Sequence, residues 1–372
     1  MVGVMISSKM GDALPFVIMV IMEGCTIGLT ILAKTAMSGG MSPFVFVVYT
    51  NALSTLFLFP FSFFFHRHER VEQSLFTFPL FLRFCFLGFT GVALSQNLAF
   101  LGLNYSSPIV VCAMGLLIPS FSFFLSIFLR KTELKWRRSS FQSKVIGSLI
   151  SMVGAFLVAF YKGPFVRNDS SSSFSKLYHK QHLFVFYSTP DHWLLGCFLL
   201  AASFLCVSVW NIIQLGTMKE YPQLQVMKVA CFYSFAGTIQ SAIFSFILLR
   251  DDFDAWKLHF NMDLLLILFT AIFGSVVRSS VQICFGRKRG PFYVPLFQPF
   301  RIFWACFFGI TFFANSLHYG SVIGTVICGM GYYTVMWGQT KQDQKPINDV
   351  EKSDSSDEKV PLLLQQDDDQ VV

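Results

Sequence analysis

Apolar runs of about 20 residues recur along the whole chain, and this feature restricts its fold more than any other. A helix of that length crosses the ~30 Å hydrocarbon layer of a membrane. Only 13% of the residues are charged, whereas a soluble domain carries roughly 25% because its surface faces water. The sequence therefore predicts an all-α polytopic membrane protein. The ten runs are residues 13–35, 43–65, 79–102, 108–129, 145–161, 193–215, 227–249, 263–286, 292–313 and 321–338.

Lys and Arg gather in alternate links between these runs, above all in the segment RKTELKWRR at 130–138. Because cytosolic links of membrane proteins are enriched in Lys and Arg, this pattern predicts that both termini are cytosolic. Topology also accounts for the net charge of +7, so no nucleic-acid partner is expected. The segment 1–12 is expected to be a cytosolic N-terminus. The acidic segment 339–372 holds few large apolar residues and is predicted to be a disordered cytosolic tail.

Parts of the sequence repeat. Residues 145–158, VIGSLISMVGAFLV, match residues 322–335, VIGTVICGMGYYTV, at six of fourteen positions. One glycine-to-proline spacing recurs as well, as Gly91 to Pro108 and as Gly274 to Pro291. Both matches fall in corresponding runs of the two halves, and they predict a duplicated five-helix unit.

The predicted units are residues 13–163 and 193–338, joined by an extracytosolic link at 164–192. Five is an odd number of crossings, so the second unit must enter the membrane from the opposite side. Ten transmembrane helices in two inverted repeats are the plan of many secondary transporters, which bind solute near the bilayer midplane between the repeats.

Six stretches of the sequence are distinctive: GGMSPFVFVVY (39–49), NYSSPIVVCA (104–113), SKVIGSLISMVGAFLVAFYKGP (143–164), WNIIQ (210–214), KEYP (219–222) and GSVIGTVICGMGYYTVMWG (320–338). They resemble the plant nodulin-like family related to WALLS ARE THIN, which belongs to the EamA type of the drug/metabolite transporter superfamily. The resemblance covers roughly residues 13–340 and implies ten helices in two EamA-like halves. It also implies transport of amino acids, auxin or related carboxylate metabolites, without fixing which one.

Two charged residues lie at similar depth in different runs: Glu23 in the first and Arg301 in the ninth. An arginine at the bilayer centre costs at least ~2.5–3.5 kcal/mol, so such residues pair, line a wet cavity or bind a solute. One hypothesis is that Arg301 clamps a solute carboxylate, while Glu23 receives an amine or exchanges a coupling proton. The alternatives are a permanent Glu23–Arg301 ion pair, or an Arg301 guanidinium bound by backbone carbonyls freed near Pro299.

The ninth run is also rich in proline, and its helix is predicted to start at Pro291. A proline inside a helix removes one donor and frees the carbonyl four residues earlier. Pro299 would free the carbonyl of Pro295, which favours a kink or an opened turn beside Arg301. A straight helix affected only in its first turn is the alternative.

Further polar residues within the runs are candidates for hydrogen bonding to a solute. Trp210 and Gln214 are four residues apart and share one helix face. The alternative for the whole group is hydrogen bonding between helices, which polar side chains often provide in membranes. Arg278 is expected to extend to the cytosolic surface. The candidates are Asn51, Gln96, Asn97, Trp210, Asn211 and Gln214.

No catalytic residue, metal ligand or cofactor is expected. The centre of no run carries an aspartate, and His192 and His318 stand at run ends, which disfavours an intramembrane enzyme. A receptor or scaffold without transport is the other alternative. The plasma membrane is the expected location, and an acidic dileucine-like segment at 358–363 makes the vacuolar membrane the alternative. The sequence indicates no oligomeric state.

Overall fold

The structure is a computed structural model. It describes residues 2–64, 78–129, 138–161, 192–221, 226–250, 253–257, 262–290, 292–312 and 318–357. These residues form helices and turns, and none of them lies in a β-strand. The predicted link 164–192 falls almost entirely outside the described residues.

The described residues of the first half form seven α-helices and one π-helical segment. In two places, several elements follow one another along a single long run: α3, η1 and α4, and then α5 and α6. The elements are α1 (Val2–Ser38), α2 (Pro43–Phe64), α3 (Phe78–Gly88), η1 (Phe89–Leu94), α4 (Ser95–Tyr105), α5 (Pro108–Gly115), α6 (Ile118–Phe128) and α7 (Ser139–Phe160).

The second half has the same order of long and interrupted helices. A second π-helical segment, η4, lies between α10 and α11, as η1 lies between α3 and α4. The two glycines of the predicted repeat, Gly91 and Gly274, fall inside η1 and η4. The elements are α8 (Trp193–Glu220), α9 (Val226–Leu248), η3 (Phe253–Trp256), α10 (Met262–Ile272), η4 (Phe273–Arg278), α11 (Ser279–Arg289), η5 (Pro295–Phe297), α12 (Phe300–Phe312) and α13 (Tyr319–Asp357).

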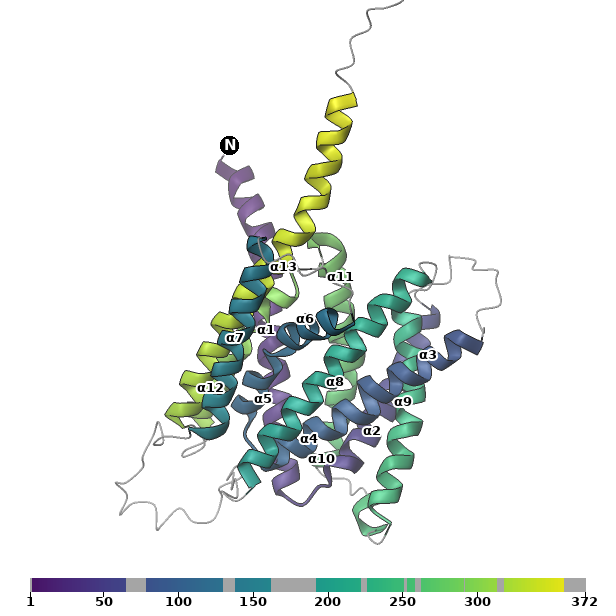
Figure 1. The fold of residues 1–372 in the computed structure, drawn as a ribbon. Coiled ribbons are helices and arrows are strands. Elements are labelled where there is room, and N and C mark those ends of the chain that lie inside the picture. Colours follow the sequence, from purple (N-terminus) through teal and green to yellow (C-terminus); the bar gives the residue numbers. More distant parts are fainter. Residues whose placement is uncertain are drawn as a thin grey trace, which may run out of the picture.

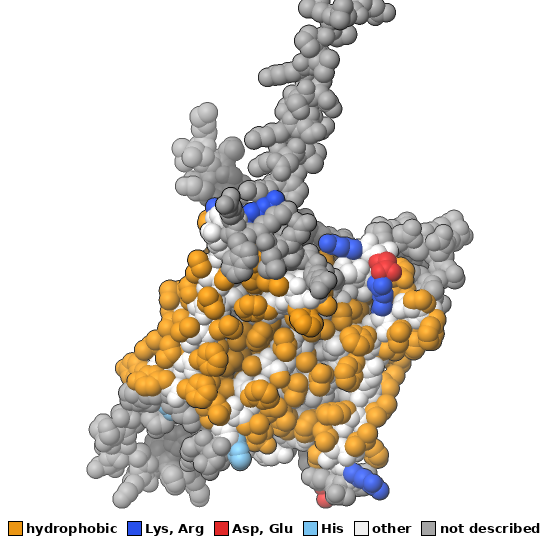
Figure 2. Space-filling model, in the orientation of Figure 1, with side chains coloured by type: hydrophobic (Ala, Val, Ile, Leu, Met, Phe, Trp, Pro, Cys, Tyr) orange, Lys and Arg blue, Asp and Glu red, His pale blue; other side chains and the backbone are white. Residues whose placement is uncertain are grey.

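Eight helical stretches of the described chain are long and apolar enough to cross a membrane. They coincide with the first eight predicted runs. The runs 292–313 and 321–338 correspond to the region of α12 and to α13, which are helical but are not among the eight. Figure 2 shows hydrophobic side chains covering the middle of the molecule, with charged side chains at its two ends. The protein is a multi-pass integral membrane protein.

The termini of the bundle extend to one side. The N-terminal end of α1 and the C-terminal part of α13 both leave the bundle on the same side (Figure 1). α13 continues as a helix to Asp357, so residues 339–357 of the tail that was predicted to be disordered are helical here. The Gln and Lys residues that follow Gly338 are good helix formers and let α13 continue beyond the bundle.

The two stretches with matching sequence pack against each other, because one lies in α7 and the other in α13. A Cβ built on Gly147 would lie 2.8 Å from the carbonyl oxygen of Gly331, and one on Gly154 would lie 2.7 Å from that of Gly324. In the sequence match, Gly147 aligns with Gly324 and Gly154 with Gly331. Gly147 thus contacts the counterpart of Gly154, and Gly154 contacts the counterpart of Gly147. A two-fold axis that relates the two helices requires this exchange. Small residues at a membrane helix interface allow this close approach.

The ninth predicted helix does not start at Pro291. Turns and the short 3₁₀ segment η5 occupy residues 292–299, and α12 begins only at Phe300. Pro299 has no N–H to donate to the carbonyl oxygen of Pro295. That oxygen accepts hydrogen bonds from the backbone N–H of Gln298 at 3.1 Å and from the hydroxyl of Tyr332 at 2.7 Å. The prediction of an opened segment beside Arg301 agrees with this geometry, because a freed carbonyl in the membrane needs another donor.

Candidate functional site

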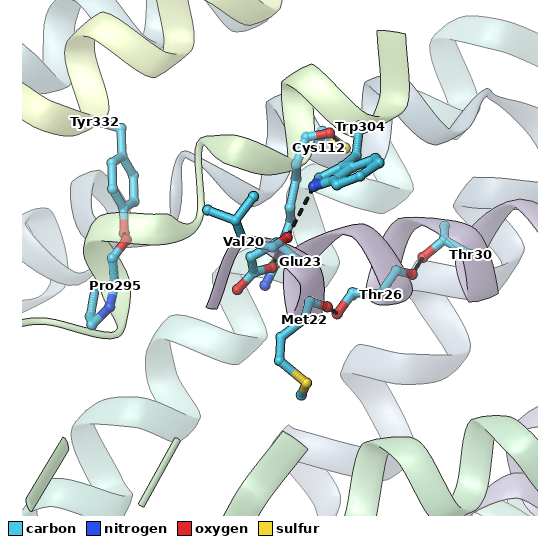
Figure 3. A network of polar contacts seen from close by, with 10 residues as sticks. Val20, Met22, Glu23, Thr26, Thr30, Cys112, Pro295, Trp304 and Tyr332 are labelled. Carbon is cyan, nitrogen blue, oxygen red and sulfur yellow. Dashed lines mark hydrogen bonds and ion pairs between the residues drawn. The ribbon is translucent and has the colours of Figure 1, made fainter. Parts of the chain in front are cut away.

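The two buried charges, Glu23 and Arg301, form an ion pair. Nε of Arg301 lies 2.5 Å from Oε2 of Glu23, and their side chains are 19% and 3% exposed. Glu23 lies in the middle of the membrane-length part of α1, and Arg301 is the second residue of α12. Removing both charges from water is expensive, and pairing reduces that cost. Figure 3 shows Glu23 among side chains from several helices.

Close contact between α1 and α12 brings the ion pair together. The indole nitrogen of Trp304 donates a hydrogen bond to the carbonyl oxygen of Val20 at 3.0 Å, drawn as a dashed line in Figure 3. A Cβ on Gly24 would lie only 2.7 Å from the Trp304 ring, so glycine is the residue that lets the ring approach α1. Phe16 adds an edge-to-face contact with Phe300, with ring centroids 5.8 Å apart.

Two residues from other helices complete the surroundings of Arg301. The thiol of Cys112, on α5, lies 3.9 Å from the carbonyl oxygen of Arg301. Tyr332, on α13, interacts electrostatically with Arg301 while its hydroxyl binds Pro295. Figure 3 shows Tyr332 and Pro295 facing each other. The pair therefore lies where α1, α5, α12 and α13 meet.

Arg278 is a further cation within the predicted spans, and its charge acts on the Glu23–Arg301 pair. It is the last residue of the π-helical segment η4, is half-buried, and interacts electrostatically with both Arg301 and Glu23. Among the described residues it forms no hydrogen bond and no ion pair. The expectation that Arg278 extends to the cytosolic surface stays a prediction. With Gly91 aligned on Gly274, the counterparts of Arg278 and Arg301 are Ser95 and Ile118.

Asn51 and Gln96 contact each other across α2 and α4. The amide nitrogen of Asn51 donates to the side-chain oxygen of Gln96 at 2.6 Å and to the carbonyl oxygen of Val47 at 2.8 Å. Asn51 is buried and Gln96 is half-buried. This is the hydrogen bonding between helices that was named as the alternative to solute binding.

Asn97 is likewise bonded within the protein. Its amide nitrogen donates to the carbonyl oxygen of Ala93 at 2.6 Å and to the hydroxyl of Ser241, on α9, at 2.9 Å. Its side-chain oxygen is buried and accepts no hydrogen bond from the described residues. Asn97 thus joins α4 to α9 and keeps one unused acceptor.

Trp210 lies against the first π-helical segment. A Cβ on Gly91 would lie 2.4 Å from the Trp210 ring, and the ring packs edge-to-face on Tyr233 with centroids 5.6 Å apart. Its buried indole nitrogen has no partner among the described residues. Asn211 and Gln214 are half-buried on the same helix, α8. In the described part of the chain, no hydrogen bond joins this group to Glu23 or Arg301.

Lys34 is a second buried cation that the sequence analysis did not single out as a site residue. It is 2% exposed, and its ammonium donates to the carbonyl oxygen of Asn104, next to the end of α4. The last carbonyls of a helix lack partners within that helix and attract a positive charge. This contact explains the lysine as a helix cap. In the part of the chain that the structure describes, no group of three or more His, Cys, Asp or Glu could hold a metal ion.

The described residues thus belong to a helical, polytopic membrane protein with an ion pair buried among its helices. Comparison with known proteins identifies its family. Residues 14–160 match the model of the EamA-like transporter family. WAT1-related protein At1g70260 of Arabidopsis thaliana is 54% identical, over 96% of this chain and 97% of that protein. WAT1-related protein At1g60050 of the same plant is 53% identical, over 94% and 95%. The chain belongs to the WAT1-related family of EamA-like transporters.

A solved structure supports the same fold. One crystal structure aligns with a TM-score of 0.50 and 16% sequence identity, covering 85% of this chain and 96% of the solved one. At that identity the likeness concerns the fold alone. The family assignment indicates a transporter, not an enzyme.

Proposed function

We propose that the protein is a secondary carrier or facilitator of small organic solutes, and that Arg301 binds a carboxylate of the solute. The observation that carries this proposal is that most N–H donors of the Arg301 guanidinium have no partner among the described residues. A guanidinium has five N–H donors, and only Nε–H has a partner among the described residues, the carboxylate of Glu23. The remaining donors form the planar fork that matches the two oxygens of a carboxylate.

The proposed architecture is ten transmembrane helices in two inverted repeats, residues 13–163 and 193–338. The exchanged glycine contacts between α7 and α13 support a two-fold relation of the halves. The π-helical segments η1 and η4, at corresponding positions, support it too. On this plan the predicted run 292–313, which contains α12, forms the ninth crossing, and α13 forms the tenth. Both termini face the cytosol, and the plasma membrane is the proposed location, with the vacuolar membrane as the alternative.

In this mechanism the solute alternates with Glu23 as the partner of Arg301. Alternating access moves one repeat against the other around a fixed site near the midplane. The opened segment before Phe300 allows α12 to change its position without breaking a regular helix, because its freed carbonyl is already bonded by Tyr332. Glu23, released by the solute, is then able to receive an amine or a proton. The charged or titratable groups that interact with it are Arg301, Arg278, Cys112 and Tyr332.

The proposed solutes are amino acids, auxin and related carboxylates. Asn51, Gln96, Asn97, Trp210, Asn211 and Gln214 are proposed as further contacts along the path; of these, Asn97 and Trp210 keep a buried polar atom without a partner among the described residues. A receptor or scaffold would have no need for an arginine buried in the membrane with donors unused.

Flux measurements in oocytes test the proposal. Labelled amino acids and indole-3-acetic acid are offered at two external pH values to wild type, Arg301→Leu and Glu23→Gln, with surface abundance measured in parallel. Wild type should carry a carboxylate solute, and Arg301→Leu should abolish that flux when it is expressed per amount of protein at the surface. If Glu23 exchanges a proton, Glu23→Gln should remove the pH dependence of flux. Equal flux in wild type and both variants would refute the proposed site.

A further inference from the structure

Lys34 is a buried cation whose capacity for hydrogen bonding is only partly used. Its side chain is 2% exposed, although lysines near the ends of membrane helices usually extend to the surface. The ammonium has three N–H donors, and among the described residues it donates to the carbonyl oxygen of Asn104 alone. The cap at the end of α4 therefore leaves two donors of the ammonium without a partner in the described part of the chain.

The acidic residues of the neighbouring helices do not balance this charge. Glu23 is the one acidic residue in α2, α4, α5 and the membrane-length part of α1, residues 14–38, and its carboxylate is bound to Arg301. α10 packs against the end of α1 and carries Asp263 in its first turn. Lys34 forms an ion pair with neither residue, nor with any other described one. The carbonyls at the end of α4 supply only about half an elementary charge.

The turn between α4 and α5 adds further donors next to this cation. Ser107 is the N-cap residue of α5, but its hydroxyl forms no capping hydrogen bond and is buried without a partner among the described residues. The first N–H groups of a helix lack partners within that helix and favour an anion. Ser107 follows Asn104, which binds Lys34, by three residues. Ile31, one turn before Lys34, belongs to the same apolar cluster as Ile109 at the start of α5.

We propose that Lys34 and the start of α5 form a second anion site, which binds the carboxylate of the solute at the extracytosolic end of its path. This inference rests on the proposed function, because it adds an outer site to the carrier. On the proposed topology, α1 and α4 end and α5 begins at the extracytosolic side. Asn104, Tyr105 and Ser107 are half-buried, so the turn reaches the surface of the molecule while Lys34 lies beneath it.

Lys34 also shares a helix face with Glu23. The two residues are eleven positions apart, which is three helical turns with an offset of about 20° and a rise of about 16 Å. Arg301, which is bound to Glu23, thus contacts the same face of α1 at a deeper level. A carboxylate released from Lys34 toward the midplane would next reach the donors of Arg301. The solute would in this way have an outer and a central site.

Thiol reagents of opposite charge test for the outer site. Asn104→Cys places a thiol in the turn and keeps the backbone carbonyl that binds Lys34. The purified full-length variant, in nanodiscs of uncharged lipid, is treated with the anion 2-sulfonatoethyl methanethiosulfonate or with the cation 2-(trimethylammonium)ethyl methanethiosulfonate. Mass spectrometry of the peptide with residue 104 gives both rates, each divided by the rate with a free thiol. The same measurement is made with Lys34→Gln, Lys34→Arg or Lys257→Gln added.

The ratio of the anionic to the cationic rate should fall about tenfold or more in Lys34→Gln, because a nearby charge acts on the two reagents with opposite sign. Lys34→Arg should keep the ratio. Lys257→Gln is the matched control and should keep it too, since Lys257 forms an exposed ion pair with Asp254 at 2.6 Å. If Lys34 serves only as a cap, Lys34→Gln lowers the melting temperature without changing the ratio, and the second site is refuted.

Carboxylate solutes should protect the thiol. Indole-3-acetate or tryptophan should slow modification in Asn104→Cys but not after Lys34→Gln, and tryptamine, which lacks the carboxylate, should slow neither. If neither carboxylate slows modification, the outer site is refuted, while flux in oocytes still decides the carrier function. If sodium chloride or sodium phosphate protects and the two carboxylates do not, a role in solute binding is refuted. If wild type carries no solute of the oocyte panel, the proposed function fails and the inference with it.

Discussion

Removing either partner of the Glu23–Arg301 pair should destabilise the protein much more than removing both. The pair has an N–O distance of 2.5 Å, and the side chains of Glu23 and Arg301 are 3% and 19% exposed. Leaving one member of such a buried pair without its partner costs about 3–5 kcal/mol, whereas replacing both by apolar residues is often neutral. We expect Glu23→Leu and Arg301→Met each to cost about 3–5 kcal/mol, and the double variant to cost less than either single one.

Thermal melting of the purified protein measures this effect. For large domains 1 kcal/mol corresponds to roughly 2 °C in Tm, so each single variant should melt about 6–10 °C below wild type. Arg83→Met is a matched control, because Arg83 forms an ion pair of the same length, 2.5 Å, with Glu220, but with side chains 33% and 54% exposed. Exposed pairs contribute about 0–1 kcal/mol, so this variant should melt within about 2 °C of wild type.

The double variant distinguishes a coupled pair from two independent charges. In a double-mutant cycle, two residues that contact each other show a coupling energy, while independent residues are additive. If the double variant loses the sum of the two single losses, Glu23 and Arg301 do not stabilise each other. A buried, mutually neutralising pair would then be the wrong description of these residues.

Packing, hydrogen bonding and topology each give one further prediction. Gly91→Ala should lower Tm by several degrees, because its Cβ would lie 2.4 Å from the Trp210 ring and overpacking costs about 1–3 kcal/mol. Gly274→Ala is the control and should leave Tm unchanged, because its Cβ would meet nothing within 4 Å. Equal losses of Tm in the two variants would contradict the packing at η1. Tyr332→Phe should cost about 1 kcal/mol and lower Tm by about 2 °C, since the carbonyl of Pro295 keeps the hydrogen bond from Gln298. A loss of about 3 kcal/mol or more, on the order of a broken buried ion pair, would show that the hydrogen bond from Gln298 does not satisfy that carbonyl. Epitope tags at the two termini should both be accessible from the cytosolic side in permeabilised cells, and accessibility of only one would refute an even number of crossings.

Much of the fold is predictable from the sequence, because each membrane helix is recognisable by its own length and apolarity. The two glycine-rich stretches lie face to face in α7 and α13, as a duplicated unit with a two-fold axis requires. The π-helical segments are not predictable in this way, since no composition signal separates them from the α-helix around them. α12 begins later than predicted, because three prolines within nine residues favour turns over a helix that begins at Pro291.

The candidate site was only partly predictable. Equal depth in two spans suggested a shared site for Glu23 and Arg301, and the two do form an ion pair. Arg278 was missed because its distance along the helix from the basic residues at 287–289 suggested an extended side chain. Its electrostatic interaction with Arg301 and Glu23 depends on how η4 packs against the other helices, which no local pattern reveals. Comparing the repeats was the available signal, since the counterpart of Arg278 is the uncharged Ser95.

Counterflow in proteoliposomes tests most directly whether the protein is a carrier with its site at Arg301. Vesicles containing purified wild type or Arg301→Leu are loaded with unlabelled indole-3-acetate, or with tryptophan in a parallel series, and the labelled compound is supplied outside at low concentration. An alternating-access carrier accumulates label transiently above its equilibrium level, because outward movement of unlabelled solute returns the site for inward movement. We predict this overshoot for wild type with at least one of the two solutes, and its absence with Arg301→Leu. A wild-type time course equal to that of protein-free vesicles with both solutes would contradict a carrier function for this protein.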